Sequence, residues 1–202
     1  MKSRGCLIAA VVGGAIAVVL IGLFLWGMGV YNNLVTLDEG TRSAWSQVES
    51  QYQRRADLIP NLVETVKGFA NQEQDVLLGV TEARAKVSQM TVTKEVLEDP
   101  KTFAKFQAAQ DQLSSALSRL LVVSENYPQL KSNENFLALQ TQLEGTENRI
   151  TVERQRYNVS VQSFNTTLRR FPGSLIAGFT GFKEKAYFEA KEGAENAPAV
   201  KF

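Results

Sequence analysis

The sequence predicts an all-α protein in which an N-terminal transmembrane helix continues into a long antiparallel, up-down four-helix bundle with a short C-terminal tail. Residues 5–30 are 26 consecutive residues without a charge, proline, Asn, Gln, Ser or Thr. Beyond them, apolar residues recur at steps of three and four, the spacing of one face of an α-helix. We divide the chain into the N-terminus and membrane helix (1–30), the bundle (31–172) and an apolar docking tail (173–202).

The apolar segment is long enough to cross a bilayer. At about 1.5 Å per residue, roughly 20 helical residues span a hydrocarbon core of ~30 Å. A signal peptide is the alternative, but its apolar core is only about 7–15 residues long and precedes a small-x-small cleavage site. Gly27 and Gly29 match such a site poorly, and Cys6 precedes the apolar run, whereas the cysteine of a lipoprotein would follow it.

Flanking charges predict the orientation of the membrane helix. Lys2 and Arg4 precede it, and the next cation is Arg42. Because cations stay on the cytoplasmic side, we expect the N-terminus in the cytoplasm and the bundle outside. Trp26 and Tyr31 suit the outer interface, where amphipathic rings settle.

Composition limits the function of the part outside the membrane. Without Lys2 and Arg4, 20 of the 22 cations remain against 21 acidic residues, so no basic surface for nucleic acid is expected. One cysteine excludes an internal disulfide. The absence of histidine from the sequence removes the usual general base and the commonest metal ligand. We expect no catalysis, no cofactor and no metal site.

The first bundle helix is expected to continue directly from the membrane helix as a stalk. Pro60 predicts a kink in it, because proline lacks an N–H and clashes with the preceding turn. The residues from Gly68 to Gln72 predict a turn, after which a second apolar series runs from Val76 to Met90. Without that turn the two series would form one very long helix in a three-helix arrangement. We favour four helices.

Two further long helices complete the bundle. Asp99 and Pro100 predict a helix start, with Asp as the N-cap and proline at the first helical position. The segment 126–132 closes that helix. The last helix is expected from Asn133 to Arg170, with an apolar seam that suits a coiled-coil-like contact. Short connections then place the first and last helices antiparallel.

The tail is rich in apolar side chains but too short to build its own core. It is expected to dock on its own bundle, on a neighbouring subunit or on a partner, and an extended end could occupy a groove or sheet edge. The candidate interaction residues here are Phe179, Phe182, Tyr187, Phe188, Pro198 and Phe202.

Two polar clusters are further candidate interaction sites. The residues around Pro60 either bind a ligand where the kink frees a backbone carbonyl or pair between helices and fix their register, and we favour pairing. Two arginines at the end of the last helix face its macrodipole favourably or contact phosphate. The residues concerned are Arg54, Arg55, Asp57 and Asn61, and Arg169 and Arg170.

Small residues recur every fourth position in the membrane helix, at Ala9, Gly13 and Ala17. This spacing lets helices approach closely in lipid. Together with the stalk and the apolar tail, it predicts a homo-oligomer.

Several blocks resemble the LemA family. The longest runs from Ala44 to Glu73, and Phe69 and Asn71 depart from it, since Tyr and often His are expected there. Shorter matching blocks are Tyr31-Asn-Asn-Leu-Val35, Ala83-Arg-Ala85, Arg156-Tyr-Asn158, Phe164-Asn165, Arg170-Phe-Pro172, Gly181-Phe182, Tyr187-Phe-Glu-Ala190 and Ala197-Pro198. The resemblance implies a bacterial single-pass protein of the inner membrane with a helical bundle and no enzymatic activity. One similar branch acts in building magnetosome membranes, and relatives are often encoded beside membrane proteases.

Three function classes remain. A scaffold of the cell envelope, self-associating through span, stalk and tail, is the leading hypothesis. An adaptor that presents its bundle or the Pro198 tail to an envelope enzyme, such as a membrane protease, is the alternative. A ligand sensor is disfavoured, because only Met1 to Arg4 precede the span and could receive a signal.

Overall fold

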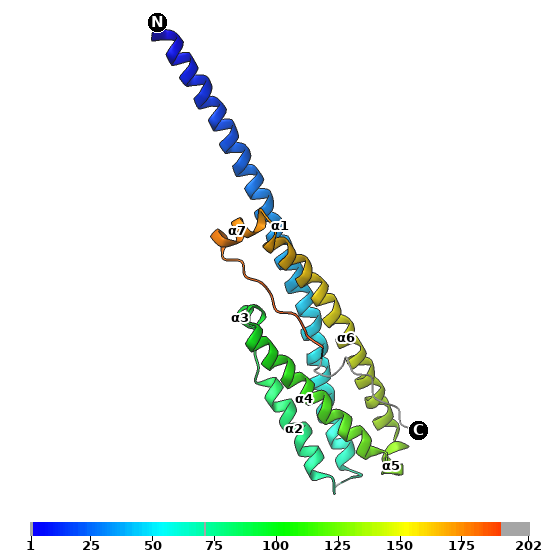
Figure 1. Cartoon of the computed structure of the whole chain (residues 1–202). Helices are drawn as coiled ribbons and strands as arrows, with labels where there is room; N and C mark the ends of the chain where they lie inside the picture. The colour runs from blue at the N-terminus through cyan, green and yellow to red at the C-terminus, as the bar shows by residue number, and fades with distance from the viewer. Residues whose placement is uncertain (1, 71, 191–202) are drawn as a thin grey trace, which may run out of the picture.

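The computed structural model describes the backbone of residues 2–70 and 72–190, and the side chains from residue 11 onward within those ranges. All regular structure in these ranges is helical, as predicted (Figure 1). The helices are α1 (Lys2–Lys67), α2 (Gln74–Ser88), α3 (Lys94–Glu98), α4 (Pro100–Ser124), α5 (Pro128–Lys131), α6 (Glu134–Arg169) and α7 (Gly173–Thr180).

Helix α1 joins the membrane helix to the bundle without a break. Its first part is apolar on every side, and the side chains of residues 11–25 are all exposed in the isolated chain. A helix that is apolar all round and covered by no other part of its protein belongs in lipid. Further along, α1 becomes amphipathic and buries Leu34, Val48 and Ile59 against the bundle. The predicted stalk is therefore confirmed.

The predicted break after this helix is also present. Helix α1 ends at Lys67, and α2 begins at Gln74. The backbone N–H of Ala70 donates to the carbonyl of Val66 at 2.8 Å, which closes the turn. Four long helices result, rather than three.

The ends of α4 and α6 follow the capping signals of the sequence. The Asp99 carboxylate accepts hydrogen bonds from the N–H groups of Lys101 and Thr102, and Pro100 occupies the first turn of α4. The Asn133 side chain accepts a hydrogen bond of 3.0 Å from the N–H of Phe136 at the start of α6. Both caps satisfy N–H groups that the helix itself leaves free.

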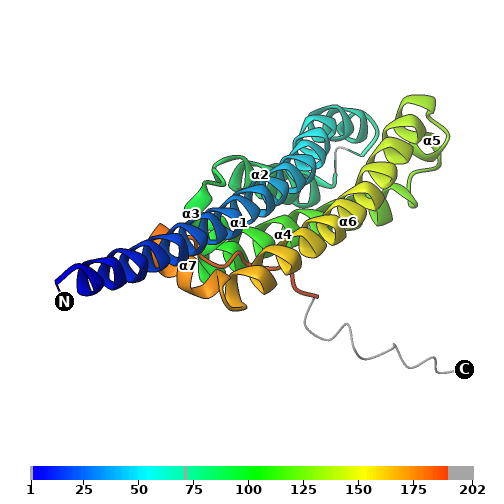
Figure 2. The ribbon, with the colours of Figure 1, turned by 90° about the horizontal axis from the view of Figure 1, so that it is seen from above.

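The four long helices run up and down, with α1 beside α6 and α2 beside α4 (Figures 1 and 2). Helices α2 and α4 pack only against the part of the bundle far from the membrane. Nearer the membrane, the pair formed by α1 and α6 is covered by α3, α7 and an extended segment (Figure 1). The tail therefore supplies part of the bundle wall.

The buried side chains form three clusters along the bundle axis. The distal cluster is mainly aliphatic and includes Ile59, Leu62, Leu113 and Leu143. The middle cluster is mainly aromatic and draws on α1, α3, α4, α6 and the tail. The cluster nearest the membrane joins Leu34, Phe164, Leu168 and Ala177.

Candidate functional site: the C-terminal strap and the groove beside α4

The part of the tail after α7 is an extended strap that lies along the bundle. We use strap for residues 182–190. Gly181 ends α7 in the left-handed conformation, with φ of 76°, which a glycine adopts without steric cost. From there the strap runs away from the membrane between α4 and α6 (Figure 1). Of the three docking alternatives for the tail, the described residues therefore show docking on the chain's own bundle.

Three side-chain amides hold the backbone of the strap, each through one donated and one accepted hydrogen bond. Asn165 pairs in this way with Lys185 (2.9 and 2.9 Å), and Asn158 with Phe188 (2.9 and 2.9 Å). Gln107 of α4 pairs with Glu189 (2.7 and 3.1 Å). Each side-chain amide thus pairs with a backbone N–H and a backbone carbonyl of the strap, as a neighbouring strand does in a β-sheet.

The spacing of the two asparagines matches the strap. Asn158 and Asn165 are seven residues apart in α6, which is two helical turns or about 10.5 Å. Their partners Lys185 and Phe188 are three extended residues apart, about 10 Å. The two rises agree, so one face of α6 clamps an antiparallel extended segment at two points.

Lys185 anchors the strap by charge as well. Its side chain is 3% exposed, and its ammonium lies 3.1 Å from the carboxylate of Asp38 on α1 and 2.8 Å from that of Glu98 on α3. A buried lysine is tolerated only when its charge is paired. The strap therefore ties α1, α3 and α6 together near the membrane end.

Phe188 anchors the strap by apolar contact. Its ring centroid lies 4.8 Å from that of Phe103, 5.5 Å from Tyr157 and 6.0 Å from Trp45. The Arg154 guanidinium covers the ring at 4.8 Å, a cation–π contact. Burial raises the pKa of Tyr157, so its hydroxyl stays protonated and donates to the carbonyl of Ala186 at 3.2 Å.

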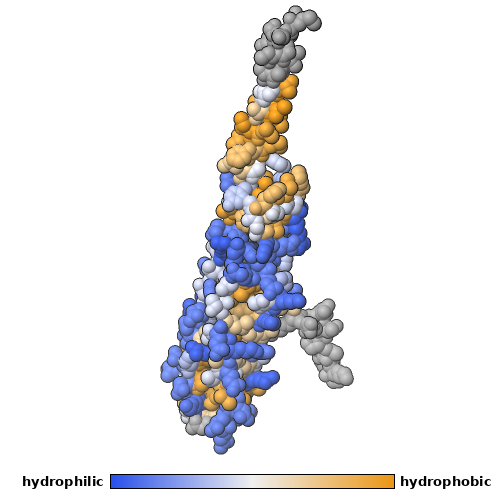
Figure 3. Space-filling model, turned by 90° about the vertical axis from the view of Figure 1, so that its left-hand side faces the viewer, coloured by the Kyte–Doolittle hydropathy of each residue, from blue (hydrophilic) through white to orange (hydrophobic). Residues whose placement is uncertain are grey.

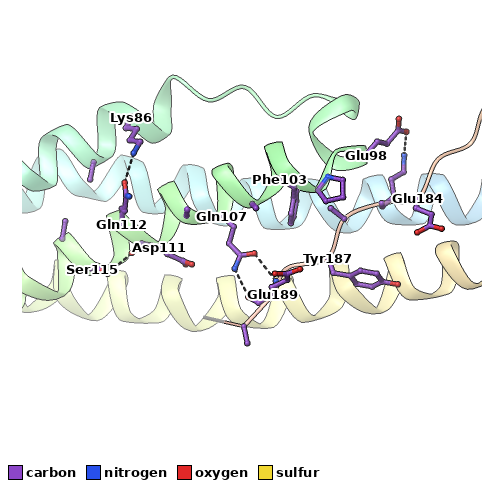
Figure 4. A pocket seen from close by; sticks show the side chains of 18 of the residues that line it. Lys86, Glu98, Phe103, Gln107, Asp111, Gln112, Ser115, Glu184, Tyr187 and Glu189 are labelled. Carbon is purple, nitrogen blue, oxygen red and sulfur yellow. Dashed lines mark hydrogen bonds and ion pairs between the residues drawn. The ribbon is translucent and has the colours of Figure 1, made fainter. Parts of the chain in front are cut away.

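A groove with a volume of about 1180 Å³ lies between α2, α4 and the strap (Figure 4). Lys86 and Gln112 bridge its wall with a hydrogen bond of 2.8 Å, and Gln107 and Glu189 close its other side. Its lining mixes cations, carboxylates and small apolar residues. In the described part of the chain no three Asp, Glu or Cys side chains gather as a metal site. The groove presents hydrogen-bonding side chains beside small apolar ones.

Comparisons with known proteins identify the family. A family model described as the LemA family matches residues 44–202, most of the bundle and the whole tail. The chain belongs to the LemA family. The sequence resemblance to this family is thereby confirmed.

Individual relatives carry two kinds of name. The magnetosome proteins MamQ 1 and MamQ 2 of Paramagnetospirillum magneticum are each 28% identical over 178 residues, which is 80% of this chain and 65% of theirs. The chain therefore spans slightly less than two thirds of these relatives. A protein named LemA from Metamycoplasma hominis is 25% identical over 176 residues, or 87% of this chain and 76% of that protein.

Several blocks of the LemA resemblance turn out to build the strap site. The Arg156-Tyr-Asn158 block supplies Tyr157 and Asn158, the Phe164-Asn165 block supplies Asn165, and the Tyr187 block supplies the strap itself. Sequence reasoning did not select Asn158, Asn165, Gln107 or Lys185 as site residues. Asn158 and Asn165 lie inside blocks of the LemA pattern, which was their only signal, whereas Gln107 and Lys185 lie outside those blocks and carried none.

The cluster near Pro60 is resolved into internal contacts. Arg55 is 1% exposed, and its guanidinium donates to Glu147 on α6 at 2.7 Å, to Ser114 on α4 at 2.8 Å, and to Gln110. This is pairing between helices, the favoured interpretation. Arg54, Asp57 and Asn61 lie on the exposed surface of α1.

Helix α1 passes through Pro60 without ending. Proline has no N–H, so the carbonyl four residues earlier, that of Ala56, loses its helical donor. Arg84 of α2 replaces it and donates from Nε to this carbonyl at 3.0 Å. The carbonyl freed by the proline is therefore used inside the LemA bundle, by the arginine of the Ala83-Arg-Ala85 block.

The remaining predicted residues lie in different places. Arg169 forms an ion pair with Glu184 at the start of the strap, and Arg170 is exposed. Phe182 is half-buried, whereas Tyr187 and Phe179 are exposed. Gly13 and Ala17 lie on the exposed surface of the membrane helix. The side chain of Ala9, and Pro198 and Phe202 entirely, lie outside the described residues.

Proposed function

We propose that this protein is a scaffold of the bacterial inner membrane, with its N-terminus in the cytoplasm and its bundle outside. The observation that carries the proposal is the continuity of α1, which is one helix from the membrane segment to the far end of the bundle. A continuous helix couples the orientation of the bundle to that of its membrane part and holds the bundle at a set distance from the membrane segment. Relatives that are magnetosome proteins support a role in organising a membrane.

The scaffold proposal includes self-association through the membrane helix and the stalk. Apart from its own helix backbone, no atom of the described residues lies within 4 Å of a Cβ added at Gly13. A second helix can therefore approach this face, since small residues allow close approach. Phe182, Lys185 and Phe188 of the tail pack within their own chain, so these residues contribute less to self-association than the sequence suggests.

The mass of the full-length protein in detergent, measured by light scattering, tests self-association. We expect a discrete oligomer for the wild type and a shift toward monomer for Gly13→Ile. Ala15→Ile is the matched control, because residue 15 is about 200° around the helix from residue 13. A monomeric wild type at micromolar concentration rejects the proposal, as does an equal shift for both variants.

An adaptor is the second candidate, and the strap favours it. The clamp of Asn158, Asn165 and Gln107 demonstrates that this bundle recognises an extended backbone, and the open groove lies directly beside it. The partner would be an envelope enzyme such as a membrane protease. Deleting residues 196–202 separates the two candidates: an adaptor that uses its tail loses its partner, whereas a scaffold built on the membrane helix stays assembled.

A further inference from the structure

Helix α7 and its flanks form an uncharged apolar unit. No charged residue occurs from Phe171 to Phe182. Three large apolar side chains in this stretch are strongly exposed: Phe179 (84%), Phe171 (75%) and Leu175 (52%). Leu175 and Phe179 are four residues apart in α7 and therefore lie on the same side of it, and Phe171 lies two residues before the helix. We call these three residues the outer face of α7.

The opposite side of α7 packs on the protein. Ala177 is buried, and Ile176 packs with it against the cluster of Leu34, Phe164 and Leu168. At the start of α7, a Cβ on Gly173 would lie 2.0 Å from the carbonyl oxygen of Thr167. Only glycine permits this close approach. The position of α7 is therefore fixed by its inner side, and the outer face is not needed for folding.

The place of α7 is the end of the membrane segment. Ile176 Cδ1 lies 3.8 Å from the position of a Cβ on Gly27, and the rings of Trp26 and Phe171 are 6.2 Å apart between centroids. Residues 26–31 close the apolar run that crosses the bilayer. Helix α7 therefore lies at the depth where lipid headgroups meet the acyl chains.

We propose that α7 is an interfacial helix that inserts its outer face into the leaflet from which the membrane helix emerges. The partner is the phospholipid bilayer. The apolar surface of the membrane helix is followed toward the bundle by a second apolar patch and then by hydrophilic surface (Figure 3), so the patch is continuous in depth with lipid. An apolar helix face at this depth is buried by acyl chains.

Flanking charges complement this placement. Arg170 precedes the uncharged stretch and Lys183 follows it, and both are exposed, whereas the neighbouring Arg169 is paired with Glu184. Long basic side chains at an interface extend toward phosphate groups while their stems remain in apolar surroundings. Elsewhere on the bundle, the exposed apolar residues Leu78 and Val122 occur on two different helices, α2 and α4, and single exposed apolar residues are ordinary for a soluble surface. The outer face of α7 differs by clustering beside the membrane.

Insertion gives the bundle a second attachment to the membrane. A single helix leaves a protein free to rotate about that helix and to tilt with it. A second contact on one side fixes which side of the bundle faces the bilayer. It also adds area to one leaflet only, since α7 does not cross the membrane.

Depth-dependent fluorescence quenching in nanodiscs tests the proposal. A full-length Cys6→Ala protein receives one new cysteine at Phe179, labelled with an environment-sensitive dye. Leu78→Cys is the matched control, because it is an exposed apolar residue on α2, in the distal half of the bundle. We expect lipids with a shallow quencher to reduce the emission at residue 179 at least twofold more than at residue 78. Aqueous iodide should give the reverse order.

Two results would overturn the proposal. Equal iodide quenching at residues 179 and 78 would place the outer face in water. Protection of residue 179 from both lipid quencher and iodide would mean that protein, such as a second copy, covers it. Because Phe179 is almost fully exposed, its replacement is not expected to disturb the fold, and an unchanged helical circular-dichroism signal checks this. Exposure of residue 179 to iodide would leave the scaffold proposal standing, and its coverage by a second copy would support self-association while overturning insertion, so the two proposals are judged separately.

Discussion

The distal and membrane-proximal halves of the bundle are stabilised by different kinds of side chain. In the distal half, four helices contribute aliphatic residues at regular helical spacing. In the proximal half, α1, α6 and the first turns of α4 are joined by an extended strap. The strap contributes a buried lysine and the ring of Phe188, and three side-chain amides of α4 and α6 bind its backbone. The distal half is built mainly by regular helix packing, to which the contact of Arg84 with the Ala56 carbonyl is added, whereas the proximal half depends mainly on specific partners.

This difference indicates where the molecule is specialised. Apolar contacts tolerate exchange of one aliphatic residue for another of similar volume. Buried polar groups do not, because each one that loses its partner keeps its desolvation cost. The proximal half is also the half that lies nearest the membrane and carries the strap. Its specific contacts therefore position the groove beside α4 and the outer face of α7.

Removing Phe188, the aromatic anchor of the strap, should have the largest effect on the stability of the protein. Phe188→Ala removes a buried ring from the proximal core, and we expect the free energy of unfolding to fall by about 3–5 kcal/mol. Urea denaturation in neutral detergent, followed by circular dichroism, measures this change. Tyr187→Ala, which truncates an exposed neighbour, is the control and should change stability far less. A loss below about 1 kcal/mol for Phe188→Ala would mean that the strap is not part of the cooperative core.

Removing the central arginine should have the next largest effect. Arg55→Met leaves Gln110 and Ser114 without their donor, and Glu147 without its cation. Breaking a buried pair costs about 3–5 kcal/mol, but Glu147 retains some contact with water, so we expect about 2–3 kcal/mol. Arg54→Met is the control, because Arg54 is exposed on the adjacent position. Similar losses for both variants would contradict the central role of Arg55.

The sequence predicted the periodic features of this fold well. Helical spacing located all four long helices, the capping signal at Asp99 located the start of α4, and glycine and asparagine located the turn after α1. Each of these features depends on residues close together in the chain. Local rules suffice for them.

The strap and α7 were not predictable in the same way. The apolar density of the tail indicated docking, but the docking surface comprises residues from α1, α3, α4 and α6, and Asp38 precedes its partner Lys185 by 147 residues. Asn158 and Asn165 look like ordinary polar positions until the strap lies against them. Likewise, Pro60 predicted a freed carbonyl, but only the packing of α2 shows that Arg84 occupies it.

Loss of the contact between Arg84 and Ala56 should have a moderate effect on stability that depends on the presence of Pro60. We expect Arg84→Met to lower the free energy of unfolding by about 1–2 kcal/mol, because the Ala56 carbonyl then lacks a donor. In a Pro60→Ala background, residue 60 has an N–H that can donate to the Ala56 carbonyl. Arg84→Met should then lower the free energy of unfolding by a smaller amount. A double-mutant cycle measures this coupling, expected to exceed about 0.5 kcal/mol. If the stability losses of Arg84→Met and Pro60→Ala simply add in the double mutant, Arg84 stabilises the protein through a contact other than the Ala56 carbonyl.

The ion pair at the start of the strap should have the smallest effect and a distinct pH dependence. The hydrogen bond and charge of Arg169 lower the pKa of Glu184 below its usual value. Stability from a lowered carboxyl pKa is present above the unfolded-state value, about 4.3 for Glu, and is lost as the pH falls through the lower folded-state value. Hydrogen exchange of the strap amides, compared between wild type and Arg169→Gln in neutral detergent, should therefore differ at pH 7 and converge below pH ~4. Arg170→Gln, which removes an exposed neighbouring cation, is the control and should show the same hydrogen exchange as the wild type at every pH. If the exchange of Arg169→Gln still differs from that of the wild type at low pH, the effect of this arginine comes from packing rather than from its charge.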